Sequence, residues 1–351
     1  MKTRRFPDLV IGPLNTAGQA TLWAKGLRNL GVNAESRGIF SPDRRRRNGN
    51  PDRWLLPTTR RGTKTFGSLW NEHLPEPNHY LNESLHTTSA STHSIRQQVQ
   101  HSHNLYSKFA VVFHGSDIRS PQKHMRANKN SHFALFEDHY LNTLEEQISE
   151  KRELIEINQI KTFVTTPDLL HDISSATWLP LSVDIELWDG RISEDSGRLN
   201  IMHLPSKIDP PIKGTPQIIS TMSKFEKTVN FELLTGLNHS EVPNALARAD
   251  IVIDQFLIGS YGLGAIEAMA SANVVIADLS MIPKDVKKSL IDNQLPIVDC
   301  SIDTLEEAIE RILDTRHQVI EQKLKGRQFV SRIHSIENSA EIMMKWLKQC
   351  D

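Results

Sequence analysis

Short apolar runs alternate with stretches of helical periodicity along most of this chain. The runs from Phe109 to Phe113 and from Ile251 to Ile253 are continuous and rich in aromatic or β-branched residues, as expected for strands buried on both faces. Similar runs are found at residues 9–11, 163–164, 200–204, 229–234, 274–276 and 296–298. Because helical segments separate many of these runs, the pattern predicts an α/β protein with parallel sheets.

Several helical segments carry start or stop signals. From Gln19 apolar residues recur at helical spacing, and Gly31 follows as a stop. Residues 135–160 form a charged helical region, and Ser240 can cap a helix over residues 241–248. Further helices are predicted at residues 263–272, 304–313 and 336–347.

Residues 41–105 interrupt this alternation. Segments such as SPDRRRRNGNPDR are basic and rich in glycine and proline, which predicts a long mobile insertion at about 41–78. The run Arg44–Arg47 is of a kind that is usually solvated. The basic residues of 44–61 could also contact an anionic acceptor or an anionic membrane surface, at roughly 1 kcal/mol per basic residue.

Length and composition describe an ordinary globular protein. The 351 residues are enough for two domains, with 38% hydrophobic and 24% charged residues. A formal net charge of -1 gives no bias toward nucleic acid, so no nucleic-acid partner is expected. Two cysteines, Cys300 and Cys350, and the lack of a signal-peptide core or a membrane-spanning run favour a cytoplasmic location, with peripheral membrane contact as the alternative.

The most informative stretch lies between Ile251 and Leu279. A strand is followed by a loop with Gly259, Gly262 and Gly264, then by a helix that carries Glu267 near its start. Free N–H groups and the positive end of the helix dipole can hold a phosphate at such a loop. Glu267 would repel a phosphate but could accept hydrogen bonds from a neutral diol such as a ribose. A nucleotide diphosphate sugar satisfies both requirements.

Other polar residues follow strands that are expected to end at the same sheet edges. The first strand leads into a small-residue loop ending at Gly18, and the strand at 109–113 leads into His114. The strand at 200–204 leads into a loop with Lys207 and Lys213, which form a plausible phosphate clamp. The spacing of these lysines fits no Walker A motif.

Five segments together resemble the glycosyltransferases of family four, which have the GT-B fold. These segments are GPLNTAGQA, HGSDIR, TPDLL with WLPLSVD, HLPSKIDPPIKGT and GSYGLGAIEAMA. The resemblance implies two Rossmann-like domains whose parallel sheets face a central cleft. We expect an acceptor-side domain at 1–183, a donor-binding domain at 184–335, and a terminal helix at 336–351 that packs back on the first domain.

The resemblance also assigns roles to individual residues. Glu267 would bind the nucleotide ribose, Lys207 and Lys213 the diphosphate, and His114 the transferred sugar as the catalytic residue. Gly18 would approach the diphosphate. The remaining assignments are Ser206, Tyr261, Gly262 and Gly264 on the donor side, and Asn15, Asp117 and Arg119 on the acceptor side.

The function implied is transfer of a sugar from a nucleotide-sugar donor to a hydroxyl of a glycan, lipid-linked or small-molecule acceptor. The family mostly retains the anomeric configuration and usually works without a metal or other cofactor. One departure concerns Gly259, which stands where the family has the first of two glutamates; Asp254 and Gln255 are the nearby polar residues.

Three alternatives remain open. A nucleotide-sugar-binding subunit that has lost catalysis would explain Gly259, and a nucleotide-sugar epimerase could share the two-domain shape. A dehydrogenase is disfavoured, because the first loop lacks the G-x-G-x-x-G fingerprint.

Overall fold

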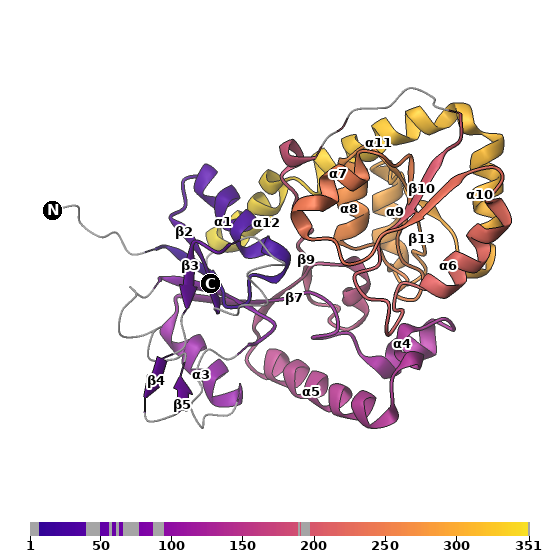
Figure 1. Cartoon of the computed structure of the whole chain (residues 1–351). Helices are drawn as coiled ribbons and strands as arrows, with labels where there is room; N and C mark the ends of the chain where they lie inside the picture. Colours follow the sequence, from indigo (N-terminus) through magenta and orange to yellow (C-terminus); the bar gives the residue numbers. More distant parts are fainter. Residues whose placement is uncertain are drawn as a thin grey trace.

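The computed structural model describes residues 7–39, 50–55, 58–60, 63–65, 77–86, 95–188, 190 and 197–349. These residues form two α/β domains, each built on a parallel sheet, that lie side by side (Figure 1). The first sheet has seven strands in the order β3-β2-β1-β6-β7-β8-β9, and the second has five in the order β11-β10-β12-β13-β14.

The N-terminal domain contains the seven-stranded sheet. Its strands are β1 (Leu9–Gly12), β2 (Ala34–Ile39), β3 (Arg53–Leu55), β6 (His79–Glu83), β7 (Lys108–Phe113), β8 (Lys161–Val164) and β9 (Thr177–Trp178). Its helices are α1 (Gln19–Asn29), α3 (Ile95–Leu105), α4 (Pro121–Ala127) and α5 (Asp138–Ile157). A separate hairpin pairs β4 (Thr58–Arg60) with β5 (Thr63–Thr65) in antiparallel register.

The C-terminal domain alternates strands and helices more regularly. Its strands are β10 (Asn200–His203), β11 (Asn230–Leu233), β12 (Ile251–Ile253), β13 (Val274–Ala277) and β14 (Val298–Asp299). Its helices are α6 (Thr215–Met222), α7 (Val242–Leu246), α8 (Leu263–Ala270), α9 (Lys284–Asp292), α10 (Leu305–Asp314) and α11 (Val319–Ile333). All described strand pairs of both large sheets are parallel.

Burial on both faces explains why the strands have continuous apolar runs. Along β7, Val111 and Phe113 belong to one hydrophobic cluster, whereas Ala110 and Val112 belong to the cluster on the opposite face of the sheet. Successive side chains of a strand point to opposite faces, so a sheet covered by helices on both sides needs apolar residues at every position.

The chain crosses between the domains twice. The first crossing contains Val183, whose N–H donates to the carbonyl of His334 in the return crossing. The last helix, α12 (Ile336–Lys348), lies against α1 of the N-terminal domain (Figure 1). A Cβ atom on Gly26 of α1 would lie 2.7 Å from Ile336 Cγ2 and 2.9 Å from Ala340 Cβ, so the absence of a side chain permits this close approach.

The structure departs from the sequence-based expectations mainly in the first domain. The predicted insertion at 41–78 contains β3 and the β4–β5 hairpin, while Arg44–Arg47 lie outside the described residues. Neither strand β6 nor helix α3 was predicted. The apolar signal of β6 is interrupted by Asn82 and Glu83. None of the helices in the described ranges is sufficiently long and apolar to cross a membrane.

Candidate functional site

A cavity of about 730 Å³ lies at the carboxyl ends of the strands of the C-terminal domain. Its volume is in the range of cavities that hold small ligands and cofactors. Ala17 contributes to the lining from the N-terminal domain. Most other lining residues come from the loops after β10, β11 and β12 and from the start of α8; they include Ser206, Lys213, Leu234, Gly236, Leu237, Asn238, His239, Val242, Asp254, Gln255, Gly262, Gly264 and Glu267.

One part of the cavity combines a cation with a helix N-terminus. Lys213 Nζ lies 2.7 Å from Asp254 Oδ1 and donates to the carbonyl of Leu204 at 3.1 Å. Gly264, in the first turn of α8, is next to this pair, since a Cβ atom there would lie 3.4 Å from both Lys213 Nζ and Asp254 Oδ1. The backbone N–H groups at the start of α8 and the ammonium group of Lys213 can therefore bind the same anionic group.

Asp254 is a buried carboxylate that lines the cavity. Its side chain is only 2% exposed, and its Oδ2 atom has no hydrogen-bond partner, although the residue lines the cavity. Gln255 beside it donates from Nε2 to the carbonyl of Ser260 at 2.5 Å, which ties the glycine loop to the end of β12.

Glu267 and His239 form a second polar group in the cavity. Glu267 is 8% exposed, and its Oε1 atom lies 2.9 Å from His239 Nε2. The hydrogen bond that His239 donates to Glu267 raises the pKa of His239 despite the opposing effect of burial. His239 follows Asn238, which forms a capping box with Glu241. The prediction that Ser240 caps this helix is therefore wrong, and His239 had no sequence signal beyond its place after a strand.

Two predicted donor residues, Tyr261 and Lys207, are not among the residues that line the cavity. Tyr261 is 2% exposed, and its hydroxyl lies 3.1 Å from His334 Nε2 at the return crossing between the domains. Burial raises the pKa of Tyr261 well above its ordinary value, so it stays protonated. Lys207 is exposed and lies outside the lining. Tyr261 and Lys207 are thus close to expected phosphate-binding loops in the sequence, but neither side chain lines the cavity.

The N–H groups of Leu14, Asn15, Thr16 and Gly18 donate to acceptors within the N-terminal domain. Leu14, Asn15 and Thr16 donate their N–H groups to the carboxylate of Glu83, at 2.6–2.9 Å. Gly18 donates its N–H to the carbonyl of Asn15 at 3.1 Å. The N–H of Gly18 is thus used inside the loop, and the expected approach of Gly18 to a diphosphate stays a prediction.

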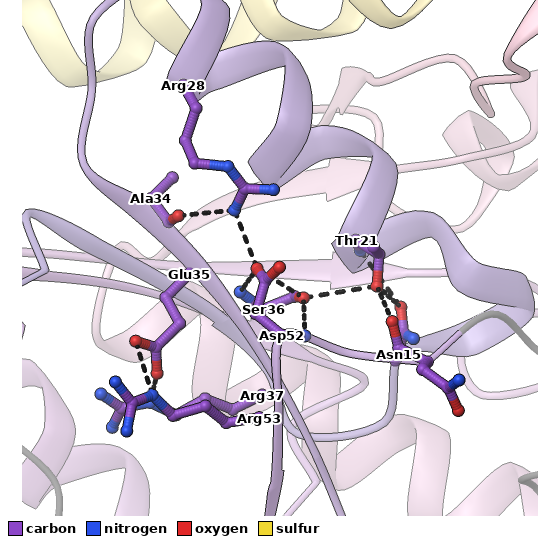
Figure 2. A network of polar contacts seen from close by, with 10 residues as sticks. Asn15, Thr21, Arg28, Ala34, Glu35, Ser36, Arg37, Asp52 and Arg53 are labelled. Carbon is purple, nitrogen blue, oxygen red and sulfur yellow. Dashed lines mark hydrogen bonds and ion pairs between the residues drawn. The ribbon is translucent and has the colours of Figure 1, made fainter.

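The side chain of Asn15 belongs to a polar network at the edge of the N-terminal domain (Figure 2). Its Oδ1 atom accepts hydrogen bonds from the backbone and hydroxyl of Thr21, and the Thr21 hydroxyl lies 3.3 Å from Ser36 Oγ. The network continues through Asp52, which accepts from Ser36 and from Arg28. Asn15 thus anchors the loop to α1, and Thr21 connects it to β2; the acceptor-side assignment of Asn15 stays a prediction.

His114 lies at the carboxyl end of β7, outside the cavity lining. Its Nε2 atom is 3.4 Å from Glu83 Oε1, and its ring stacks on that of Trp23 with centroids 6.0 Å apart. Asp117 accepts the N–H groups of His114 and Gly115, at 3.0 and 2.7 Å respectively, and so stabilises the turn after β7.

Arg119 pairs with Asp168 in the protein interior. The two side chains are 8% and 2% exposed, and Asp168 Oδ2 accepts from both Nε and Nη2 of Arg119, at 2.8 and 2.7 Å. Asp117 therefore stabilises the turn after β7, and Arg119 is held in a buried ion pair. Their acceptor-side assignments stay predictions.

The backbone explains the missing carboxylate at position 259. Gly259 has a φ of 73°, and a Cβ atom there would lie 2.9 Å from Met281 Cβ, 3.0 Å from Ser280 Oγ and closer still to Met281 Cγ. A glutamate at this position would be strained and would point toward Met281. The polar groups that line the cavity nearby are Asp254 and Gln255.

Over the described part of the chain, no group of three or more His, Cys, Asp or Glu side chains is arranged to hold a metal ion.

Comparison with known proteins gives matches in structure only. No family model and no curated protein matches the sequence. Sucrose-phosphate synthase from Thermosynechococcus elongatus matches with a TM-score of 0.65 and 13% identity, over 98% of this chain and 99% of that one. A glycosyltransferase from Rickettsia africae matches with a TM-score of 0.61 and 13% identity, over 99% and 100%. HepE from Anabaena, in complex with UDP and glucose, matches with a TM-score of 0.52 and 12% identity, over 97% and 98%.

These structural similarities span both domains, but at such low sequence identity they show the fold alone. Together with the two parallel sheets and the cavity at their strand ends, they confirm the expected fold class. The chain has the GT-B fold, with two α/β domains joined by a double crossing.

Proposed function

We propose that the protein is a glycosyltransferase that moves a sugar from a nucleotide diphosphate sugar to a hydroxyl group of an acceptor. The observation that carries this proposal is the cavity that brings Lys213, the N-terminus of α8 and Glu267 together. The structures that share the fold support it, since two of them are named as glycosyltransferase and synthase and a third holds UDP and glucose.

The cavity suggests how the donor lies. The diphosphate would be bound by Lys213 and by the backbone at Gly262 and Gly264, where the helix dipole is positive. The ribose hydroxyls would donate to Glu267, which is acceptor-only when ionised. The apolar side chains of Leu234 and Leu237 would contact the base.

Stabilising the leaving diphosphate is the main chemical requirement. The bond between the anomeric carbon and the diphosphate oxygen breaks, the acceptor oxygen bonds to that carbon, and the acceptor proton passes to the diphosphate. Positive charge and N–H groups that are already in place lower the energy of the developing anion. We propose that Lys213 and α8 supply this stabilisation without a metal, and that the sugar retains its anomeric configuration.

The finer proposals concern the acceptor and the cellular setting. We propose synthesis of a glycan, a polysaccharide or a glycolipid in the cytoplasm. Peripheral contact with an anionic membrane through the basic residues of 44–61 is proposed on sequence grounds, because half of that segment lies outside the described residues.

The test is release of nucleotide diphosphate from a panel of nucleotide sugars, with UDP-sugars first. Glu267→Gln should weaken binding of the free nucleotide roughly tenfold to a hundredfold, because hydrogen bonds to a charged acceptor contribute about 1.5–3 kcal/mol. Glu307→Gln, an exposed glutamate on α10, is the matched control and should bind like the wild type. Equal binding by both variants would contradict the ribose assignment.

The same assay separates the alternatives. Tight nucleotide binding without turnover on any donor would favour a binding subunit, for which the constrained position 259 is the motivating observation. Interconversion of the donor sugar without transfer would indicate an epimerase. Activity that persists in excess EDTA would support metal independence, and NMR of the product would give its anomeric configuration.

A further inference from the structure

Glu83 is a fully buried carboxylate at the end of β6, the middle strand of the seven-stranded sheet. Removing a carboxylate from water costs several kcal/mol unless strong partners compensate. Buried charged groups of this kind are concentrated at functional sites. The partners of Glu83 therefore indicate what its charge is used for.

Three successive backbone groups converge on this one carboxylate. The N–H groups of Leu14 and Asn15 donate to Oε2 at 2.7 and 2.6 Å, and that of Thr16 donates to Oε1 at 2.9 Å. Burial alone would raise the pKa of Glu83, but His114 and the N–H groups of Thr16 and Asn15 outweigh it and hold the pKa below its ordinary value. Glu83 is therefore ionised at neutral pH.

The loop held by Glu83 has an unfavourable backbone conformation. Asn15, Ala17 and Gly18 have φ angles of 50°, 51° and 74°. The left-handed region is unfavourable for a residue with a side chain, so this conformation needs strong contacts elsewhere. Ala17 is also the residue of this loop that lines the cavity. Glu83 thus fixes the part of the N-terminal domain that reaches the donor side.

The same carboxylate faces His114. Its Oε1 atom lies 3.4 Å from His114 Nε2, and the imidazole makes no geometrically complete hydrogen bond through either nitrogen. Glu83 is therefore a charged neighbour of the ring at 3.4 Å, and Trp23 stacks on one ring face. A neighbouring carboxylate is a common means of setting the orientation of a histidine.

We propose that Glu83 is a positioning residue for sugar transfer, which holds the loop of residues 14–18 and the ring of His114 in place without touching the substrate. This inference rests on the proposed function. It implies that turnover depends on Glu83, whereas nucleotide affinity changes little, because every described residue that lines the cavity except Ala17 comes from the C-terminal domain.

The experiment compares Glu83→Gln and Glu83→Asp with the wild type. Glu83→Gln keeps the shape but replaces one acceptor oxygen by a donor, so kcat should fall about 100-fold, as for other small displacements of reacting groups. The dissociation constant of the free nucleotide should not change. Glu83→Asp keeps the charge and should recover part of kcat.

Asp172→Asn is the matched control. Asp172 is a half-buried residue of the same domain, with its side chain 5% exposed, and its carboxylate accepts the N–H of Ser120 at 3.1 Å and pairs with Arg152. This variant should lose stability without losing kcat. A kcat loss of similar size in Asp172→Asn would overturn the inference, because any buried carboxylate would then have the same effect.

A double mutant tests whether Glu83 acts through His114. The kcat losses of Glu83→Gln and His114→Asn should combine to less than their product, because both remove parts of one arrangement. Amide hydrogen exchange of residues 13–19 should be faster in Glu83→Gln than in the wild type. If Glu83→Gln does not fold, Glu83→Asp decides by the same split between kcat and nucleotide affinity.

The outcomes separate the two proposals. Wild-type protein that releases no nucleotide diphosphate from any donor overturns the proposed function and the positioning role with it. Active wild type with an unchanged kcat in Glu83→Gln overturns the positioning role alone. A parallel loss of nucleotide affinity in the Glu83 variants would also overturn it, since the defect would then not be confined to the N-terminal domain.

Discussion

Placing a side chain at position 259 should destabilise the protein for two separable reasons. Gly259 has a φ of 73°, and leaving glycine there costs about 1–2 kcal/mol. The new Cβ atom of Gly259→Ala would also lie within 3.0 Å of Met281 Cβ and Ser280 Oγ, and overpacking of this kind costs typically about 1–3 kcal/mol. The free energy of unfolding should therefore fall by about 2–5 kcal/mol in total.

Gly236→Ala separates the two costs. Gly236 has a nearly identical φ of 72°, but a Cβ atom there would have no heavy atom within 4 Å. Gly236→Ala should therefore reduce the free energy of unfolding only by the conformational cost, about 1–2 kcal/mol. Urea denaturation of the ligand-free proteins gives both values, provided that the slopes agree.

Met281→Ala provides a second check. Removing the obstructing side chain should make the double variant Gly259→Ala with Met281→Ala less destabilised than the sum of the two single variants. If Gly259→Ala costs no more than Gly236→Ala, the contact with Met281 does not constrain position 259. The explanation for the missing carboxylate would then fail.

Three further predictions concern packing, a buried ion pair and pH. Gly26→Ala should reduce stability by about 1–3 kcal/mol through overpacking against Ile336, measured by urea denaturation; unchanged stability would show that α12 can shift. Lys323→Met leaves Asp250, bonded at 2.6 Å, without its buried partner and should cost about 3–5 kcal/mol, with recovery when Asp250→Asn is added. Burial lowers the pKa of His334 from its ordinary 6.5 to about 4. The stability that neutral His334 contributes is therefore present above pH 6.5 and is lost as the pH falls toward 4, by up to about 1.4 kcal/mol per pH unit. His334→Gln should flatten the measured pH dependence of the free energy of unfolding.

The sequence predicted the architecture because the fold depends on patterns that are local in the chain. The run from Phe109 to Phe113 is apolar at every position, which only a strand covered on both faces requires. The glycine loop before Glu267 and the loop that carries Lys213 each follow a strand. Parallel topology brings the carboxyl ends of such strands to one edge, so these two residues could be assigned to a common cavity before the structure was known.

Burial of polar residues was beyond the reach of the sequence. Glu83 and Asn82 interrupt the apolar signal of β6, and their burial results from loops and strands brought to them by the fold. Tyr261 meets His334 across 73 residues of sequence. Nothing near either residue indicates this contact.

Which way a polar side chain points at a strand end was likewise decided by the tertiary structure. Asp117, Arg119 and Lys213 all follow buried strands, and their sequence context is alike. Asp117 and Arg119 make their contacts inside the N-terminal domain, whereas Lys213 lines the cavity and pairs there with Asp254. Local patterns determine which segments become strands and helices, because that requires only periodic burial. The partner of each polar group depends on atoms that are distant in the sequence, and only the packed structure brings them within hydrogen-bond range.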